Sequence, residues 1–189
     1  MTRIIAGAAG SLRLEVPKAG TRPTSDRVRE AIFSTLESWS MVDGTRVLDL
    51  YAGSGALGLE AISRGASAAT LVEKHPQAAQ VVQRNARTVS AAFRDGSPRI
   101  DVVKQGVQGY LDGGGIGGRF DVVLIDPPYD LGEEELTANL AALAPLLAED
   151  AVVLVERSSR SPEPGWPAGL VRFKEKRYGE TVLWWCEAD

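Results

Sequence analysis

Residues 47–58 read Val-Leu-Asp-Leu-Tyr-Ala-Gly-Ser-Gly-Ala-Leu-Gly, an apolar strand pattern that leads into a glycine-rich turn and then into a helical pattern. The glycines have the spacing G-x-G-x-x-G, which lets the backbone pass close to a bound cofactor and directs the N–H groups of the following helix at it. This spacing alone is weak, because it suits nicotinamide and flavin enzymes as well as methyltransferases. The stretch therefore predicts a strand, a cofactor-binding turn and a helix, and leaves the cofactor open.

Two features favour S-adenosylmethionine as the cofactor: the position of Asp49, and the segment Asp126–Tyr129, which closes a later strand on the same edge of the sheet. Glu73 ends the next strand pattern, Ala69–Val72, eighteen residues after Gly55, a distance that suits a carboxylate binding a ribose diol. The alternative for Glu73 is a solvated strand end that pairs with Lys74. Asp49 lies inside the strand before the glycines, where its carboxylate could bind the ammonium group of methionine, a contact that a dehydrogenase does not need.

A second motif, Asp-Pro-Pro-Tyr at residues 126–129, follows the apolar run Phe120–Ile125. An exocyclic amine conjugated to a ring is a poor nucleophile because its lone pair is delocalised, so an enzyme must hold the NH2 group with hydrogen-bond acceptors. Asp126 offers a carboxylate, and two successive prolines without N–H groups leave the carbonyl of Pro127 free as a second acceptor. Tyr129 offers a flat face on which a base can stack. The motif predicts methylation of such an amine by direct in-line displacement, although the same residues also occur in ordinary turns.

The composition predicts one globular domain. At 189 residues, with 44% hydrophobic and 24% charged residues, the chain can bury one core and is too short for two large domains. Cys186 is the single cysteine and His75 the single histidine, which excludes an internal disulfide, a structural zinc cluster and a His-dependent triad. The sequence shows neither a signal-peptide pattern nor an apolar run of membrane-spanning length, so we expect a cytoplasmic protein with no metal and no membrane partner.

Charge is segregated along the chain, although the net charge of −4 by itself argues weakly against a nucleic-acid partner. Residues 1–29 hold six Lys or Arg against two acids, residues 157–177 again hold six against two, and residues 121–150 hold eight acids and no base. This separation favours a basic surface formed by the two ends of the chain. The alternative is a solvated surface with scattered charges, and for residues 157–177 both interpretations stay open.

The order of predicted elements indicates a doubly wound α/β fold. Residues 3–16 show the alternation of a β-hairpin that precedes the core and could lie outside it, and a helix follows from Thr24 or Ser25 to about Trp39. Strands are then expected from Arg46 to the glycine turn and at 68–73, 99–104, 119–125 and 151–156, helices at 57–63, 75–93, 106–112 and 132–148, and a final antiparallel hairpin at 171–177 and 181–186. Alternation of this kind gives parallel strands with right-handed crossovers. We expect residues 1–20 to form a hairpin extension that contacts RNA and residues 21–189 to form a catalytic domain.

The ends of the parallel strands predict the position of the site. In such sheets ligands bind in the crevice outside the carboxyl ends of the strands. This rule brings together five residues, which are Asp49, Gly53, Glu73, Gln105 and Asp126.

Four segments resemble the RsmD family of bacterial rRNA methyltransferases, and the resemblance runs along nearly the whole chain. The segments are Arg3–Gly7, Thr21–Phe33, Asp49–Arg64 and Asp126–Tyr129, and the Thr-Arg-Pro-Thr block at 21–24 is the most specific. The resemblance implies the class I, Rossmann-like fold of S-adenosylmethionine-dependent methyltransferases, in which an antiparallel terminal hairpin is the usual sheet edge. It further implies transfer of one methyl group to the exocyclic N2 amine of a single 16S rRNA guanine, on an assembled or partly assembled 30S subunit.

Carried over by position, the resemblance implies three groups of site residues. The cofactor would be lined by Asp49, Tyr51, Ala52, Gly53, Ser54, Gly55, Glu73, Lys74, Gln105, Gly106 and Val107, where Gln105-Gly106 replaces the Asn or Asp followed by Ala that is frequent in the family. The guanine would be held by Asp126, Pro127, Pro128 and Tyr129. RNA would contact Arg3, Arg13, Lys18, Arg22, Thr24, Arg27 and Arg29, with Thr24 and the arginines around it closing over the site.

Some of these residues also have plainer interpretations. Arg27 and Arg29 face different sides of a helix, so one of them could simply pair with Asp26 or Glu30. Gln105 could do no more than cap the helix that follows it.

Three other functions are kept as alternatives. An adenine-amine methyltransferase acting on DNA or RNA needs nearly the same acceptor geometry, and the four residues of the turn do not identify the ring. A non-catalytic RNA-binding assembly factor could keep the fold and lose turnover, although the intact Asp126, Gly53, Gly55 and Glu73 speak against it. A nicotinamide oxidoreductase is disfavoured by the Asp-Pro-Pro-Tyr turn and the terminal hairpin. We expect the protein to act as a monomer.

Overall fold

The structure is a computed structural model that describes residues 2–18, 24–94, 96–116 and 118–189. These residues form two β-sheets and five α-helices. The elements are β1 Thr2–Arg3, β2 Arg13–Leu14, α1 Asp26–Ser38, β3 Arg46–Leu50, α2 Ala56–Ser63, β4 Ala68–Val72, α3 Pro76–Ser90, β5 Arg99–Val103, α4 Val107–Asp112, β6 Phe120–Ile125, α5 Glu133–Leu143, the 3-10 turn η1 Ala144–Leu146, β7 Leu147–Ser158, β8 Leu170–Tyr178 and β9 Thr181–Ala188.

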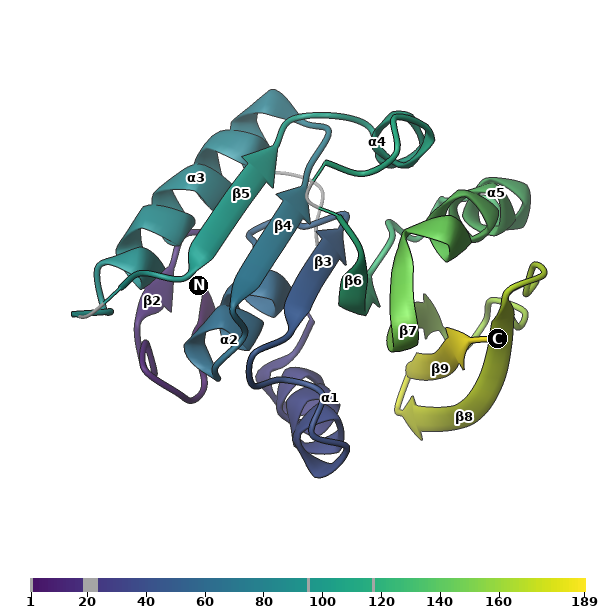
Figure 1. The fold of residues 1–189 in the computed structure, drawn as a ribbon, viewed down its shortest axis with the longest axis horizontal. Coiled ribbons are helices and arrows are strands. Elements are labelled where there is room, and N and C mark those ends of the chain that lie inside the picture. The colour runs from purple at the N-terminus through teal and green to yellow at the C-terminus, as the bar shows by residue number, and fades with distance from the viewer. Residues whose placement is uncertain (1, 19–23, 95, 117) are drawn as a thin grey trace.

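The larger sheet has seven strands in the order β5-β4-β3-β6-β7-β9-β8 (Figure 1). The first five strands in this order are parallel, and the hairpin of β8 and β9 joins β7 in antiparallel fashion. The predicted doubly wound sheet with an antiparallel terminal hairpin is therefore confirmed.

Alternate residues of the central strands face two separate cores, one on each side of the sheet. Val122 and Leu124 of β6 belong to the core that contains α1, α2 and α3, whereas Val123 and Ile125 belong to the core that contains α4 and α5. Successive side chains of a strand point to opposite faces, and a strand covered on both sides is apolar throughout. Helices thus cover both faces of the sheet and leave the strand ends as the place for a site.

The N-terminal hairpin is attached to the core and does not lie outside it. Its strands pair over only two residues each, yet Ile4 and Leu14 are fully buried beside α1 and α2. Glu60 of α2, also buried, accepts hydrogen bonds from the N–H groups of Ile5 and Ala6 at 2.8 and 3.0 Å. Helix α2 therefore satisfies part of the backbone of the hairpin, in addition to the hydrogen bonds that the hairpin makes within itself.

Gly7 is a point of close approach between the hairpin and α2, and its replacement by alanine is expected to destabilise the fold. Its φ is +83°, and a Cβ atom there would lie 1.9 Å from the carbonyl oxygen of Ser63. The left-handed conformation alone costs an L residue about 1–2 kcal/mol, and the clash adds to that cost. Gly44→Ala is the matched control, because Gly44 also has a positive φ of +72° but a Cβ there meets no atom within 4 Å. Urea unfolding should show the larger loss for Gly7→Ala, and equal losses would mean that this contact does not matter.

Helix α5 ends at Leu143, so the prediction of a helix to residue 148 is wrong. Pro145 is the reason, because proline lacks an N–H group and its ring clashes with the preceding helical turn. The chain tightens into η1 and enters β7 at Leu147. Strand β7 also continues past the predicted residue 156, since its pairing with β9 extends to Ser158.

Strand β8 forms one outer edge of the larger sheet (Figure 1). A register shift interrupts its pairing with β9 between Arg172 and Lys174. Phe173, at this bulge, meets Trp39 at the end of α1 edge to face, with 5.4 Å between ring centroids. The bulge thus joins the edge strand to the helix layer.

Candidate active site

The strand register lines up four side chains along one rim of the sheet. Leu50 of β3 pairs with Val72 of β4 and with Ile125 of β6, and Ile125 pairs with Val155 of β7. The residues one position further along are Tyr51, Glu73, Asp126 and Glu156. Ligands of doubly wound sheets bind beyond these strand ends, so this rim is the candidate active site.

Two acidic residues hold the glycine turn against the rim. Asp49 accepts a hydrogen bond from the N–H group of Gly58, and Glu73 accepts one from the N–H group of Gly53, both at 2.9 Å. The second oxygen of Glu73 accepts a backbone N–H at the start of α3 at 2.8 Å. Glu73 therefore uses both oxygens on the backbone, and the alternative pairing with Lys74 is wrong. A Cβ at Gly58 would lie 3.1 Å from Oδ2 of Asp49, so the third glycine of the motif serves close packing.

The turn itself has three positions in the left-handed region of backbone conformation. Tyr51, Gly53 and Gly55 have φ values of 63°, 59° and 80°. Ala52 and Ser54, which lie between them, are buried. The chain reverses within this turn and begins α2 directly after Gly55, so the first N–H groups of the helix lie at the rim.

Asp49 is buried, and the pKa of its carboxyl group is far from the ordinary value. Burial above all, helped by the charges of Asp126 and Glu73, raises the pKa to about 7, and the hydrogen bond from Gly58 opposes this shift. A nearby positive charge favours the ionised form of such a group. A cation bound beside Asp49 would therefore lower this pKa and favour the carboxylate.

Tyr51 is tied to the helix layer on the other face of the sheet. Its hydroxyl group accepts a hydrogen bond from Nδ2 of Asn139, a fully buried residue of α5, and burial raises the pKa of Tyr51 to about 12. This contact anchors the turn at its first left-handed residue. A single Asn within a helical pattern gives no signal in the sequence, so Asn139 is not predictable from it.

The segment predicted to meet an adenine ring follows β5. Gln105 donates its backbone N–H group to the carbonyl of Glu73 at 3.2 Å, and its side chain is exposed, as is that of Lys74. Gly106 is the N-cap of α4 and no side chain caps this helix, so the alternative that Gln105 caps it is wrong. Val107 begins α4 and is buried. The segment thus lies beside Glu73 at the rim.

The Asp-Pro-Pro-Tyr turn places an aromatic ring in solvent next to a carboxylate. Asp126 follows the last residue of β6, Pro127 is buried and Pro128 is exposed. The carbonyl of Pro128 accepts the N–H group of Leu131 at 3.0 Å, so this turn hydrogen bond does not use the carbonyl of Pro127. Tyr129 is 69% exposed, so its ring is largely open to solvent.

Two carboxylates share one hydroxyl group beside this turn. Oγ1 of Thr24 lies 2.8 Å from Oδ2 of Asp126 and 3.2 Å from Oε2 of Glu156. A hydroxyl group has one proton to donate, so it cannot satisfy two ionised carboxylates at once. Burial raises the pKa of Asp126 to about 6, and burial followed by repulsion from Asp126 raises that of Glu156 to about 8. The proximity of the two carboxyl groups therefore favours a state in which one of them is protonated.

Glu156 is a site residue that the sequence pattern does not single out. It follows the apolar residues 151–155 in the same way as Asp126 follows Phe120–Ile125. An acid after a buried strand is the available signal, but a lone glutamate at a strand end is more often solvated. Its partnership with Asp126 appears only when β6 and β7 are placed in register.

The basic residues predicted to contact RNA divide into exposed and buried ones. Those with exposed side chains are Arg3, Arg13, Lys18 and Arg27, whereas Arg22 lies outside the described residues. Thr24 lies at the rim against Asp126. Arg29 is fully buried, so the prediction that it contacts RNA is wrong.

Arg29 instead connects α1, the hairpin and α2. Its guanidinium group donates to Asp26 at 3.0 Å, to the hydroxyl of Thr2 at 3.1 Å and to the carbonyl of Arg3, and it lies 3.6 Å from Glu60. The alternative, in which one of the two helix arginines pairs with Asp26, is confirmed. A charged side chain is rarely fully buried unless it is paired in this way.

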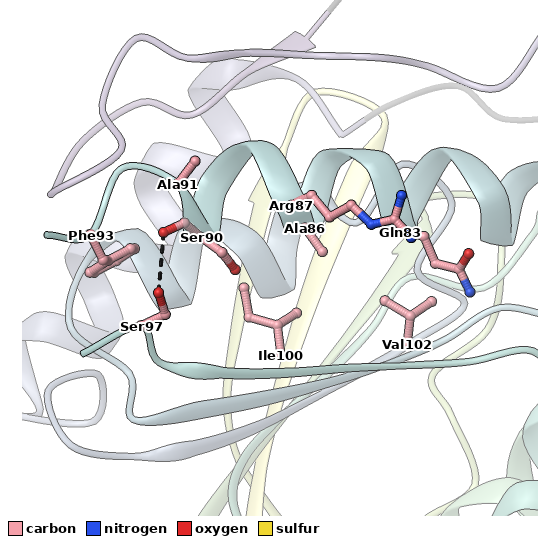
Figure 2. Close-up of a pocket in the computed structure, with 9 residues that line it drawn as sticks. All are labelled: Gln83, Ala86, Arg87, Ser90, Ala91, Phe93, Ser97, Ile100 and Val102. Carbon is pink, nitrogen blue, oxygen red and sulfur yellow. Dashed lines mark hydrogen bonds between the residues drawn. The ribbon is translucent and has the colours of Figure 1, made fainter. Parts of the chain in front are cut away.

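A separate groove of about 660 Å³ lies between α3 and β5 (Figure 2). Arg87 and Ser90 line it from α3, and Ile100 and Val102 line it from β5. Its described lining residues include none that the sequence assigns to a cofactor, a base or RNA. The rim therefore stays the candidate site.

The described residues contain neither a cluster of metal-binding side chains nor a helix that could span a membrane. Among these residues, no three His, Cys, Asp or Glu side chains form a group that could hold a metal ion. Each helix described is too short or too polar to cross a bilayer.

Fold and site together define a class I methyltransferase, in which a glycine turn and an Asp-Pro-Pro-Tyr turn share one rim of a sheet closed by an antiparallel hairpin. Solved structures have the same fold over nearly the whole chain. The putative methyltransferase yhhF from Escherichia coli has a TM-score of 0.81 and 31% identity, covering 99% of this chain and 97% of that one. A hypothetical protein from Thermus thermophilus has a TM-score of 0.80 and 31% identity, covering 98% of each chain.

Sequence comparison defines the family. Residues 2–187 match the family described as Conserved hypothetical protein 95. Over 181 residues the chain is 37% identical to ribosomal RNA small subunit methyltransferase D of Escherichia coli K12, covering 95% of this chain and 86% of the relative. It is 33% identical to the putative rRNA methyltransferase YlbH of Bacillus subtilis, covering 95% of each. The chain therefore belongs to the RsmD family, and the resemblance predicted from four segments is confirmed.

Proposed function

We propose that this protein transfers a methyl group from S-adenosylmethionine to the exocyclic N2 amine of one guanine in 16S rRNA. The proposal depends above all on the register of the sheet, in which Ile125 pairs with Leu50 and Asp126 thus lies beside the glycine turn. A methyl donor in the turn and an amine held by Asp126 would be neighbours. Relatives named as ribosomal RNA small subunit methyltransferases support an rRNA substrate.

The glycine turn has the groups that the methyl donor requires. S-adenosylmethionine, when bound, supplies an electrophilic methyl group on a sulfonium. Asp49 would bind its ammonium group, since a buried carboxyl with a raised pKa is stabilised as an anion by a cation. Glu73 would bind the ribose diol with the lone pairs that its backbone hydrogen bonds leave free. The segment from Gln105 to Val107, of which Gln105 is exposed and Val107 buried, would line the adenine.

The Asp-Pro-Pro-Tyr turn would hold the acceptor. The guanine, flipped out of its stack, rests on the exposed ring of Tyr129, while Asp126 and the carbonyl of Pro127 direct the amine lone pair at the methyl carbon. Transfer would form the N–C bond as the S–C bond breaks, and would need no covalent intermediate. The methylated amine is briefly cationic and strongly acidic, so its proton leaves to Asp126 or to water.

Cofactor affinity is expected to rise with pH around neutrality. Only the ionised form of Asp49 pairs with an ammonium group, and its pKa is about 7 in the free protein, so binding at lower pH must release a proton. The Kd should fall by up to about tenfold per pH unit below about pH 7 and level off above about pH 8. Titration calorimetry in two buffers of different ionisation enthalpy measures both the affinity and the released proton.

Asp49→Asn is the control for this pH dependence. The amide keeps the shape of the side chain and cannot ionise, so the variant should bind more weakly and with a Kd that does not change with pH. A wild-type Kd that stays constant from about pH 6 to about pH 8 would contradict the contact between Asp49 and the ammonium group.

Incubation with labelled S-adenosylmethionine tests the function directly. The substrates are 30S subunits from cells that lack this protein, free 16S rRNA, and duplex DNA. We expect label on a single guanine of 16S rRNA, and more of it on subunits than on free RNA. Label on adenine would favour the adenine-amine alternative, and cofactor binding without transfer would favour an assembly factor.

We assign the reaction to a monomer that acts on assembled or partly assembled 30S subunits in the cytoplasm. RNA contact is assigned to the hairpin and the start of α1, where the exposed side chains of Arg3, Arg13, Lys18 and Arg27 would meet phosphates. Sedimentation of the labelled protein with purified 30S subunits measures this partnership.

A further inference from the structure

We propose that Glu156 accepts a hydrogen bond from the ring N1–H of the target base and thereby selects guanine over adenine. This role depends on the proposed function, because it needs a base held by its amine at Asp126. Recognition of the base as guanine is thus assigned to a residue outside the Asp-Pro-Pro-Tyr turn.

Glu156 lies next to Asp126 across two paired strands. Ile125 of β6 pairs with Val155 of β7, so the two acidic residues follow at neighbouring strand ends, about 4.8 Å apart in backbone position. Their carboxylates point to the same place, because both lie within hydrogen-bond distance of Oγ1 of Thr24. Guanine carries its N2 amine and its N1–H on adjacent ring atoms. A base held by the amine at Asp126 therefore brings N1–H to the neighbouring acceptor.

The hydrogen-bond inventory of the base leaves one donor for Glu156. The two amine hydrogens are taken by Asp126 and by the carbonyl of Pro127. The remaining donor on that edge is N1–H, and leaving it buried without an acceptor would cost about 1–3 kcal/mol. Glu156, next to Asp126 at the rim, is placed to accept this hydrogen bond.

Within the described ranges, no cation forms an ion pair with Glu156. Arg157, the next residue, donates to Glu133 and to the carbonyl of Leu131, so its charge is bound on the α5 side of β7. The carboxylate of Glu156 instead accepts a hydrogen bond from the shared hydroxyl of Thr24. Two half-buried carboxylates beside one hydroxyl oppose folding, and such arrangements are typical of functional sites.

The same contact discriminates against adenine. Adenine has a lone pair at N1 where guanine has a hydrogen, so an adenine held by its amine would face the ionised carboxylate of Glu156 with two lone pairs directed at each other. A site built to hydrogen-bond a polar group of its substrate rejects the analogue that lacks it far more strongly than an apolar pocket does. When guanine binds, the proton held between Asp126 and Glu156 leaves to solvent and Glu156 accepts N1–H in its ionised form.

The test replaces the target guanine by 2-aminopurine, which keeps the 2-amine and has a lone pair at N1. A 16S rRNA fragment is ligated with either base at the position that the wild-type protein methylates. Methyl transfer is measured above the pKa of about 8 of Glu156, so that this group is ionised with either base. We expect wild-type kcat/KM to be at least about 100-fold higher for guanine. Glu156→Gln should reduce this preference at least about tenfold, because an amide can accept from N1–H or donate to N1.

Asp126→Asn is the matched control, since it touches the amine that both bases share. It should slow transfer to both bases by the same factor and leave the preference unchanged. Because 2-aminopurine also lacks the O6 atom of guanine, the change in preference between wild type and Glu156→Gln, rather than the wild-type preference itself, isolates N1. Cofactor affinity equal to that of wild type shows that Glu156→Gln is folded.

The outcomes separate this role from the proposed function. Transfer to guanine with the same preference in wild type and Glu156→Gln would overturn the role of Glu156 and leave the proposed function intact. Absence of transfer to guanine by the wild-type protein would overturn both. A preference that falls in Glu156→Gln and persists in Asp126→Asn supports the role.

Discussion

Replacing Asp126 with alanine is expected to lower kcat by about 10²- to 10⁴-fold while the Kd for S-adenosylmethionine changes by less than about threefold. The carboxylate is the stronger of the two acceptors that direct the amine lone pair, and the carbonyl of Pro127 alone leaves the base free to rotate. The glycine turn is held by Asp49 and Glu73 instead, so the donor site keeps its hydrogen bonds. Single-turnover transfer from labelled cofactor measures kcat, and calorimetry measures the Kd.

The same substitution should not cost stability, which separates a catalytic defect from unfolding. The pKa values of Asp126 and Glu156 are raised to about 6 and about 8. A carboxyl group with a folded pKa above its unfolded value favours folding at low pH and opposes it once the pH has risen through the folded pKa. At about pH 8 the Asp126 carboxylate opposes folding, so Asp126→Ala should melt at or above the wild-type temperature. Near-wild-type turnover with intact cofactor binding would show that Asp126 is not the acceptor.

Arg29→Met is expected to lower the free energy of unfolding by about 3 kcal/mol. Methionine fills the space of the stem but leaves Glu60, which is fully buried, without one of its two cations. The expected loss lies at the lower end of the range that is typical when one partner of a buried ion pair is removed, because Arg64 still donates to Glu60 at 2.8 Å. Urea unfolding followed by circular dichroism gives the change.

Arg27→Met is the matched control on the same helix. Arg27 is exposed, so this substitution should change the free energy of unfolding by less than about 0.5 kcal/mol. If Arg27 contacts a phosphate, the variant should bind RNA more weakly and lower the salt slope of binding by about one. Equal destabilisation by the two substitutions would contradict the division into a structural and an RNA-facing arginine.

The parts of the fold that follow from the sequence are those encoded locally. The run from Arg46 to Ser63 contains its own strand pattern, left-handed glycines and helix pattern, so β3, the turn and α2 all lie where they are predicted. Ser25 caps α1 through the N–H group of Val28, and it is one of the two residues at which this helix is predicted to start.

The features that escape prediction depend on contacts between distant residues. Arg29 differs from Arg27 only in the side of α1 on which it lies, and its partner Glu60 is 31 positions away in sequence. Glu156 becomes part of the site through the register of two strands and a hydroxyl 132 positions away. The hairpin depends on α2 for hydrogen bonds that its own short ladder lacks. No window of local sequence contains these pairs.

The bulge in β8 has a consequence for how the protein behaves in concentrated solution. An outer strand offers a row of backbone groups to which a second molecule could add, and proteins prevent such growth with kinks and with lysine or arginine along the edge. Strand β8 carries Arg172, Lys174 and Lys176 at alternate positions. The bulge between Arg172 and Lys174 interrupts the regular backbone spacing that an added strand would need for pairing. A second copy approaching in the same way would bring like charges together. Strand β8 is thereby protected from the fibre-forming addition to which a flat, uncharged edge is prone.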